Sequence, residues 1–338
     1  MRIILAGFGT VGQALAQVLH QDADRIVQAY GFRPQLTTIV DSQGSCSDDT
    51  GLNIPLALKT KKEYGTVAKY PRQGHRNSDG THLISNSEAE VVVETTPTNF
   101  KDAEPGLSNI KAALANGKHV VTANKGPLAL AMPALLELAN HRNRLLRFSG
   151  TVGGGTPFLD FAAKCMPGER IVRIRGILNG TTNYILTRME NASLTFEKAL
   201  AEAQKKGYAE RDPTNDVEGF DTAAKIVIIA NWVLKKQYSL RNLDITGITK
   251  VTPQKLKEAK ASRAKVKLVG RIEESSVSVA PEQVPTVDPT CVPDTLNALT
   301  FSTEHAGDIT LIGPGAGGER TASAIVRDLV SIRQEYAA

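Results

Sequence analysis

The chain has few of the residues that cross-link a protein or anchor it in a membrane. Its 338 residues include only three cysteines, which are far apart and show no CxxC spacing: Cys46, Cys165 and Cys291. This pattern argues against a disulfide framework or a structural zinc site and favours a reducing compartment. No apolar run reaches membrane-spanning length, and the N-terminus leads directly into a predicted strand. We therefore expect a cytoplasmic protein without a signal peptide or a membrane partner.

The chain also lacks a concentrated charge of one sign. Its net charge is +5, and the densest basic run, residues 59–76, lies in a region rich in glycine, proline and serine. That run lacks the interleaved aromatic residues and the fold motifs of a nucleic-acid-binding patch, so we expect a solvated loop and no nucleic-acid partner. The six histidines show no ligand spacing and receive no role.

Strands and helices alternate in the first half of the chain. Short apolar strands are predicted at 2–6, 36–40, 90–94, 119–122 and 145–149, with helical periodicity between several of them. This alternation predicts an α/β fold with a Rossmann-type doubly wound parallel sheet. After about residue 150, helices accompany predicted antiparallel strands at 264–279 and 296–312, which indicates a second, α+β domain. Segment 42–82 is polar and glycine-rich, and its function does not follow from its sequence.

A glycine-rich turn, GFGTVG, follows the first predicted strand and opens a helix. It comprises Gly7, Phe8, Gly9, Thr10, Val11 and Gly12. In a dinucleotide-binding GxGxxG motif the first glycine allows a tight turn, the second admits a pyrophosphate and the third packs helix against strand. The helix start then offers N–H groups to the anion. The alternative is a merely structural turn, but the βαβ pattern after it favours a cofactor site.

The acid at the end of the second strand, Asp41, bears on the choice of cofactor. An acid there typically accepts the ribose 2′-OH and disfavours a 2′-phosphate. Asp41 lies further from Gly12 than is usual, so a turn or capping role is an equal alternative. We expect NAD in preference to NADP and keep NADP open.

Residues 205–225 gather acids in front of an apolar helix. The acids are Glu210, Asp212, Asp216, Glu218 and Asp221. A spacing of four places Asp221 and Lys225 one turn apart on the same helix face. Carboxylates suit the ammonium of an amino-acid substrate, and a lysine is a candidate general acid.

Several of these residues also have a purely structural interpretation. Asp212, which precedes a proline, fits a turn or helix cap, and Glu218 fits an exposed surface position. Asp221 and Lys225 could form an ordinary exposed helix pair. A divalent metal could bind the acids, but the lysine beside them already supplies positive charge.

Several long motifs together resemble homoserine dehydrogenase. They run in the family's order over essentially the whole chain: GFGTVG (7–12), VVTANKGPLA (120–129), GTVGGGTP (150–157), GILNGTTNYIL (176–186), AQKKGYAERDPTNDVEGFDTAAKI (203–226) and GPGAGG (313–318). The resemblance is to the short form, without a C-terminal regulatory ACT domain. It implies the reversible, NAD(P)-dependent interconversion of L-homoserine and L-aspartate 4-semialdehyde.

The resemblance also implies a division of the chain and roles for particular residues. A dinucleotide-binding domain would comprise 1–148 with 314–338, and 149–313 would form a catalytic domain that makes a homodimer. The proton donor falls on Lys225, with Asp221 beside it, and Lys125 falls where nicotinamide and substrate meet. The positions implied for substrate are Glu210, Asp216, Asp221, Gly180, Thr181 and Gly207. Those implied for the cofactor are residues 7–12 with Asp41, Thr95, Thr96, Lys125 and Gly317.

A monovalent cation such as Na⁺ is implied as well. Its expected ligands are the backbone carbonyls of Val152, Gly154 and Thr156. Some family members supply a Glu to this cation where the present chain has Ser149, so binding here would depend on backbone oxygens.

Two alternatives to homoserine dehydrogenase remain open. One is a related dehydrogenase of another small amino-acid aldehyde, which a substrate screen would separate. The other is a non-catalytic nucleotide-binding sensor that keeps the fold. A sensor has no need to retain Lys125, Glu210, Asp221 and Lys225 together.

Overall fold

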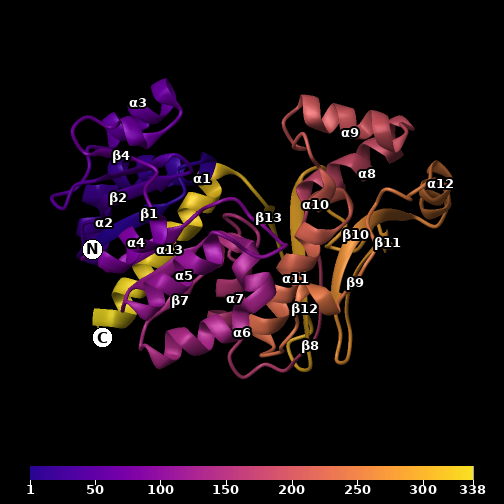
Figure 1. Cartoon of the computed structure of the whole chain (residues 1–338). Helices are drawn as coiled ribbons and strands as arrows, with labels where there is room; N and C mark the ends of the chain where they lie inside the picture. Colours follow the sequence, from indigo (N-terminus) through magenta and orange to yellow (C-terminus); the bar gives the residue numbers. More distant parts are fainter. Residues whose placement is uncertain (338) are drawn as a thin grey trace. The chain divides into compact units, whose positions relative to one another are not determined.

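The structure, a computed structural model, describes residues 1–337 and divides into two compact units (Figure 1). The first contains Met1–Thr151 and the C-terminal segment that starts at Gly317, and the second contains Val152–Ala316. Within the described residues, no helix combines the length and the apolar character needed to cross a bilayer.

The first unit is built on a seven-stranded sheet of order β4-β3-β2-β1-β5-β6-β7. Its strands are β1 (Arg2–Ala6), β2 (Gln35–Asp41), β3 (Gly44–Ser47), β4 (Gly74–Arg76), β5 (Val91–Glu94), β6 (His119–Thr122) and β7 (Leu146–Arg147). The strands from β2 through β1, β5 and β6 to β7 are parallel, whereas β3 and β4 pair antiparallel. The predicted doubly wound α/β fold is confirmed.

Helices and short 3₁₀ turns connect and cover these strands. They are α1 (Thr10–Gln21), α2 (Ala23–Tyr30), α3 (Ile54–Tyr64), η1 (Val67–Lys69), α4 (Gly80–Asn86), α5 (Gly106–Ala115), α6 (Lys125–His141), η2 (Ser149–Thr151) and α13 (Gly318–Ala337). The C-terminal helix α13 packs against α1, so the end of the chain returns to its first unit (Figure 1). Ile3, Leu5 and Val93 are fully buried, as expected for parallel strands covered on both faces.

The polar segment after β2 contains regular secondary structure, and the expectation of a solvated loop at residues 59–76 is wrong. It forms β3, α3, η1, β4 and α4. Asp41 fixes it: the carboxylate accepts hydrogen bonds from Lys61 Nζ (2.7 Å) and from the backbone N–H of Val67 (2.9 Å). It also accepts from the Thr66 hydroxyl (3.0 Å) and the Gln43 N–H (3.0 Å). Burial opposes ionisation, but these donors together lower the pKa of Asp41.

The second unit contains a six-stranded sheet of order β13-β12-β8-β10-β11-β9. Its strands are β8 (Ile171–Ile177), β9 (Asp244–Ile245), β10 (Ala264–Ile272), β11 (Val277–Pro285), β12 (Leu296–Thr303) and β13 (Asp308–Pro314). All neighbours pair antiparallel except β9 and β11, in agreement with the predicted α+β character.

Helices of the second unit carry part of the acidic segment. They are α7 (Phe158–Cys165), α8 (Gly180–Ala192), α9 (Phe196–Lys205), α10 (Thr214–Val217), α11 (Phe220–Val233) and α12 (Pro253–Ala261), with η3 at Leu240–Asn242. Every residue of α11 from Thr222 to Asn231 is buried, so α11 is a core helix. Its single lysine, Lys225, is therefore held inside the unit.

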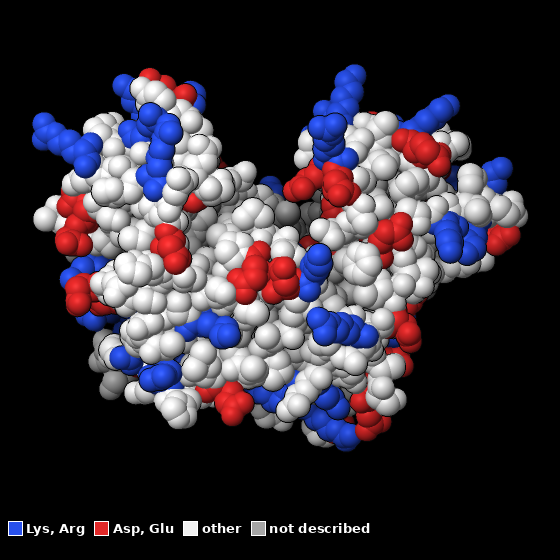
Figure 2. All heavy atoms as spheres, in the orientation of Figure 1, with Lys and Arg blue, Asp and Glu red and all other residues white. Residues whose placement is uncertain are grey.

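The face in Figure 2 shows lysine and arginine interspersed with acids.

Replacing Asp41 tests how the ordered segment is held. Asp41→Asn removes the charge and turns one acceptor oxygen into a donor that faces Lys61 and Val67. We expect the free energy of unfolding to fall by about 2–4 kcal/mol, because donors around a buried carboxylate lose their partner. Urea denaturation measures the change, and Asp49→Asn, at an exposed acid of the same segment, is the control. Equal stability of the two variants would contradict this role.

A buried histidine predicts how stability depends on pH. Burial, with Arg144 and Arg147 nearby, lowers the pKa of His119 to about 4, and its Nδ1 accepts from the Leu145 N–H (3.0 Å). Unfolded histidine titrates near 6.5, so the unfolded chain binds the extra proton between these values. The contribution of neutral His119, up to about 3 kcal/mol, is present above pH 6.5 and lost toward pH 4.

The measurement is urea unfolding of the wild type and His119→Asn at pH 4.5 and 7.5. Asparagine keeps an acceptor near the Nδ1 position and does not titrate, so the wild type should lose more stability than the variant on acidification. His20→Asn, at an exposed histidine, should lose as much stability on acidification as the wild type does. Parallel pH curves for wild type and His119→Asn would show that His119 is not the titrating group.

Candidate functional site

The lysine of α11 is the centre of a buried polar cluster in the second unit. Lys225 is only 6% exposed. Its Nζ donates to the Leu178 carbonyl (2.5 Å) and to Asp221 Oδ2 (2.6 Å), one helical turn away. The predicted i,i+4 pair is therefore present, and it is a buried pair rather than an ordinary exposed one.

An asparagine that the sequence analysis did not assign to the site joins the two aspartates. The Asn179 side-chain amide donates to Asp216 Oδ1 (2.6 Å) and to Asp221 Oδ2 (2.9 Å). Its Oδ1 caps α8 by accepting from the Thr182 N–H (2.8 Å). Asn179 thus ties the start of α8 to α10 and α11. Its place in the NGTTN motif was the sequence feature that could have assigned it to the site.

The carboxyl of Asp216 is less acidic than that of an ordinary aspartate. Burial raises the pKa of Asp216, and the negative charge of Asp221 raises it further, while Asn179 and Lys225 oppose the shift. The cluster therefore holds two carboxyl groups against one ammonium. Such a site is complementary to a further positive charge.

Two residues predicted for substrate, Gly180 and Thr181, lie beside the cluster, and a third, Gly207, follows α9. Gly180 starts α8, and a Cβ there would lie 2.7 Å from the Thr295 carbonyl oxygen, so a larger residue would displace backbone. Thr181 donates to the Tyr208 carbonyl (2.7 Å) and hydrogen-bonds Asp216. Gly207 has φ +74°, a left-handed conformation that glycine adopts readily, just after α9.

Not all the acids join this cluster. Glu210 is exposed, and its backbone carbonyl accepts from Gln204 Nε2 (3.0 Å). Asp212 accepts from the N–H (3.1 Å) and hydroxyl (2.6 Å) of Thr214, which is the turn arrangement named as its structural alternative. Within the described residues, no group of three or more His, Cys, Asp or Glu is placed to hold a metal ion.

In the first unit, the geometry of the GFGTVG turn fits a dinucleotide. Gly7 has φ +99°, and a Cβ there would lie 2.5 Å from the Thr95 carbonyl carbon. A Cβ on Gly12 would lie 2.2 Å from the Gly7 carbonyl oxygen, whereas one on Gly9 would meet nothing within 4 Å. The first and third glycines are thus required by packing, and open space faces the second, where a pyrophosphate would approach.

The first N–H groups of α1 have no capping side chain and are placed to bind an anion. Gly9 occupies the N-cap position and supplies no capping side chain. The first N–H groups of a helix need partners, and a phosphate can provide them. Gly317, with φ +130°, precedes α13, and a Cβ on the next residue, Gly318, would lie 3.1 Å from Thr10 Cγ2. The two helix starts are therefore adjacent.

The threonines after β5 are placed beside this turn. Thr95 donates its hydroxyl to the Gly7 carbonyl (2.8 Å), which fixes the glycine turn. Thr96 hydrogen-bonds the Glu94 carboxyl through its N–H (2.9 Å) and its hydroxyl. Lys125 is the first residue of α6 and is half-buried.

Asp41 already accepts the four hydrogen bonds described above. A carboxylate offers about four lone-pair positions, so a ribose hydroxyl would have to replace one of these donors. Lys61 also neutralises its charge. The role of Asp41 in reading the ribose stays a prediction.

The loop predicted for a cation is a tight glycine turn. Gly153 and Gly154 have φ of +81° and +54°. The Thr156 carbonyl already accepts from the Phe158 N–H (2.9 Å). Ser149 is committed elsewhere, because its hydroxyl and N–H donate to Asp328 at 2.6 and 2.9 Å. The cation ligands also stay a prediction.

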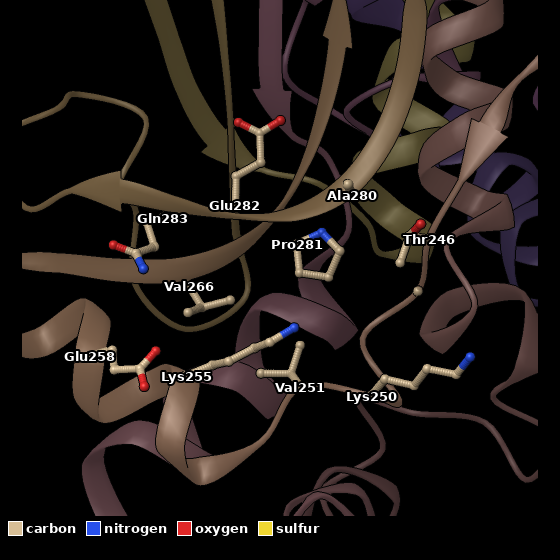
Figure 3. A pocket seen from close by; sticks show the side chains of 11 residues that line it. Thr246, Lys250, Val251, Lys255, Glu258, Val266, Ala280, Pro281, Glu282 and Gln283 are labelled. Carbon is tan, nitrogen blue, oxygen red and sulfur yellow. The ribbon is translucent and has the colours of Figure 1, made fainter.

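A pocket of about 370 Å³ in the second unit contains none of the predicted site residues (Figure 3). It lies among α12, β10, β11 and the loop before α12, and its lining includes Lys250, Lys255 and Glu258. Another lining residue, Glu282, is paired with Arg271. The Lys225 cluster, rather than this hollow, gathers the groups that can do chemistry.

Comparison with known proteins agrees with both halves of this description. The family model "Homoserine dehydrogenase, NAD binding domain" matches residues 7–149, and "Homoserine dehydrogenase" matches residues 157–330. A homoserine dehydrogenase of Methanocaldococcus jannaschii is 42% identical, with 98% of each chain covered. An NAD(+)-dependent homoserine dehydrogenase of Pseudomonas canavaninivorans is 35% identical over 98% of this chain and 96% of its own.

Solved structures give the same answer. A hyperthermophilic archaeal homoserine dehydrogenase in complex with NADPH superposes with a TM-score of 0.87 at 27% identity, covering 99% of this chain and 98% of its own. The chain therefore belongs to the homoserine dehydrogenase family, which comprises NAD(P)-dependent oxidoreductases acting on a CH–OH group.

Proposed function

We propose that this enzyme interconverts L-homoserine and L-aspartate 4-semialdehyde, a step toward threonine, methionine and isoleucine, and that Lys225 is its general acid–base. The observation that carries the proposal is the buried Lys225–Asp221 pair with Asn179 and Asp216 around it. A related aldehyde of another small amino acid is the alternative, and a substrate screen separates the two.

Lys225 is suited to move a proton at the substrate oxygen. The nicotinamide, when bound, exchanges the hydride, so the oxygen on the same carbon gains or loses a proton. An ammonium has three N–H donors, of which Leu178 and Asp221 take two, and the third can point to the substrate. Lys125, by the family resemblance, would add positive charge that stabilises a developing alkoxide.

The acids supply negative charge for the other end of the substrate, its α-ammonium group. Homoserine carries an α-ammonium group, and the cluster of Asp216 and Asp221 has one more carboxyl than Lys225 can balance. We assign the ammonium to these acids together with Glu210. Gly180 and Thr181, at the start of α8, and Gly207, after the end of α9, would shape the backbone around it.

The nucleotide would be held by Gly7–Gly12, Thr95, Thr96, Lys125 and Gly317. We propose that NAD is preferred through Asp41, by less than about tenfold in kcat/KM, or 1.4 kcal/mol, because Lys61 neutralises the carboxylate that would otherwise repel a 2′-phosphate.

Three further proposals concern the assembly and its surroundings. The enzyme is a homodimer through the second unit, it works in the cytoplasm, and a monovalent cation is held by the carbonyls of Val152, Gly154 and Thr156. The family resemblance supports the first and third. The three free cysteines support the second.

Replacing the lysine tests its proposed role. Lys225→Met should lower kcat by about 10²–10⁴-fold, the usual contribution of a general acid–base group. The dissociation constant for NADH, measured by fluorescence, should stay within about twofold of the wild type, since Lys225 would serve the substrate. Thermal unfolding checks that the variant is folded, because the change also leaves Asp221 without its lysine.

A matched control uses Lys236, an exposed lysine that follows the same helix. Lys236→Met should leave kcat and the NADH dissociation constant unchanged. Loss of NADH binding in Lys225→Met, or turnover within tenfold of the wild type, would show that the role assigned to Lys225 is wrong.

A further inference from the structure

A buried carboxyl at the end of β5 is not part of the chemistry proposed so far. Glu94 is fully buried, and it follows three buried valines, Val91–Val93, at the carboxyl end of a central parallel strand. Ligands of open α/β sheets bind at this end of the strands. A buried acid needs donors to remain there, and the identity of its donors indicates what it does.

The donors to Glu94 come from two separate loops. Oε1 accepts from the N–H (2.9 Å) and the hydroxyl of Thr96, in the loop after β5. Oε2 accepts from the Thr122 hydroxyl (3.4 Å), at the end of β6, and Asn124 also hydrogen-bonds the carboxyl. Glu94 thus joins the ends of two neighbouring strands.

Asn124 extends this connection to the start of α6. Its Nδ2 donates to the Thr96 hydroxyl oxygen (3.2 Å) and the Pro97 carbonyl (3.4 Å). Its Oδ1 accepts from the Gly126 N–H (3.0 Å), which caps the helix that Lys125 begins. The orientation of this cap is therefore set partly by the Glu94 carboxyl.

We propose that Glu94 is a positioning residue, whose ionised carboxylate holds Thr96 and the Asn124–Lys125 turn in the arrangement that binds the nicotinamide cofactor. The inference rests on the proposed cofactor roles of Thr96 and Lys125. An ionised carboxylate is only an acceptor, and the groups around it are donors: the N–H and hydroxyl of Thr96, with Thr122 and Asn124, which share their hydrogens with other acceptors. A protonated carboxyl would bring a further hydrogen into a site already lined by donors.

The Glu94 carboxyl gains its proton within a pH range that a binding experiment can cover. Burial raises the pKa of Glu94 to about 7, against the stabilising effect of Thr96, Asn124 and Thr122. Charged side chains on the neighbouring strands are remote along the sheet: Ala6 and Thr122 lie opposite Glu94, whereas Arg2 and His119 lie at the other ends of β1 and β6. On the adjoining helices, Lys111 of α5 is exposed and lies outside the buried face of that helix, and Lys125 is the half-buried first residue of α6.

The test is the dissociation constant for NADH, followed by NADH fluorescence between pH 6 and pH 8.5. If the ionised form alone binds well, the wild-type constant should rise about tenfold from pH 8 to pH 6, because one pH unit below the pKa about nine-tenths of the groups are protonated. Glu94→Gln should bind NADH about tenfold more weakly at pH 8 and show no such pH dependence. A constant within twofold of the wild type, with the pH dependence kept, would overturn the proposal.

A second variant disturbs the same network without changing its acid. A Cβ on Gly106, the first residue of α5, would lie 2.6 Å from Asn124 Nδ2 and 3.0 Å from Glu94 Oε2. Gly106→Ala should therefore weaken NADH binding at pH 8. The matched control is Gly80→Ala at the first residue of α4, where the nearest atoms would be 3.6 Å away, at ordinary contact distance. Equal NADH binding by the two alanine variants would also overturn the proposal.

Activity separates this inference from the function on which it rests. If the wild type oxidises homoserine but Glu94→Gln and Gly106→Ala bind NADH normally, the positioning role is wrong and the proposed function stands. If the wild type does not turn over homoserine, the proposed function fails, while the NADH constants still decide the role of Glu94. Urea unfolding of each variant identifies a loss of fold, which would lower binding at every pH alike.

Discussion

The catalytic half of this enzyme depends on burying one ammonium group, that of Lys225, on an apolar helix. A buried lysine is costly unless its charge is paired and its N–H groups find acceptors. Lys225 meets both conditions through Asp221 and the Leu178 carbonyl, and Asn179 then holds Asp221 together with Asp216. The same contacts that make burial possible bring α8, α10 and α11 together around the place where we propose that substrate binds.

A comparable constraint operates in the nucleotide-binding half. The turn after β1 is tight because Gly7 approaches Thr95 and Gly12 approaches Gly7, and no side chain fills the space over Gly9. The neighbouring strand ends are tied through Glu94 and Asn124. In both units, therefore, buried polar groups fix loops where we propose that ligands bind, while the apolar sheets supply the rigid frame.

Local patterns in the sequence predicted the doubly wound sheet and the pair of Asp221 and Lys225. Apolar strands with helical periodicity between them indicated the doubly wound sheet, and the i,i+4 spacing placed Asp221 beside Lys225. Contacts between distant segments could not be read in this way: Asn179 lies 42 residues from Asp221, and Lys61 lies 20 from Asp41. The basic run 59–76 was wrongly expected to be a solvated loop for this reason, because its structure depends on a carboxylate outside it.

The most direct test of the proposed reaction is steady-state oxidation of L-homoserine by the purified wild-type enzyme, with NAD and NADP compared at pH 8. We expect turnover with both cofactors, with kcat/KM higher for NAD by less than about tenfold. A folded protein that binds NADH yet oxidises no homoserine with either cofactor would contradict the assignment of the Lys225 cluster to this reaction.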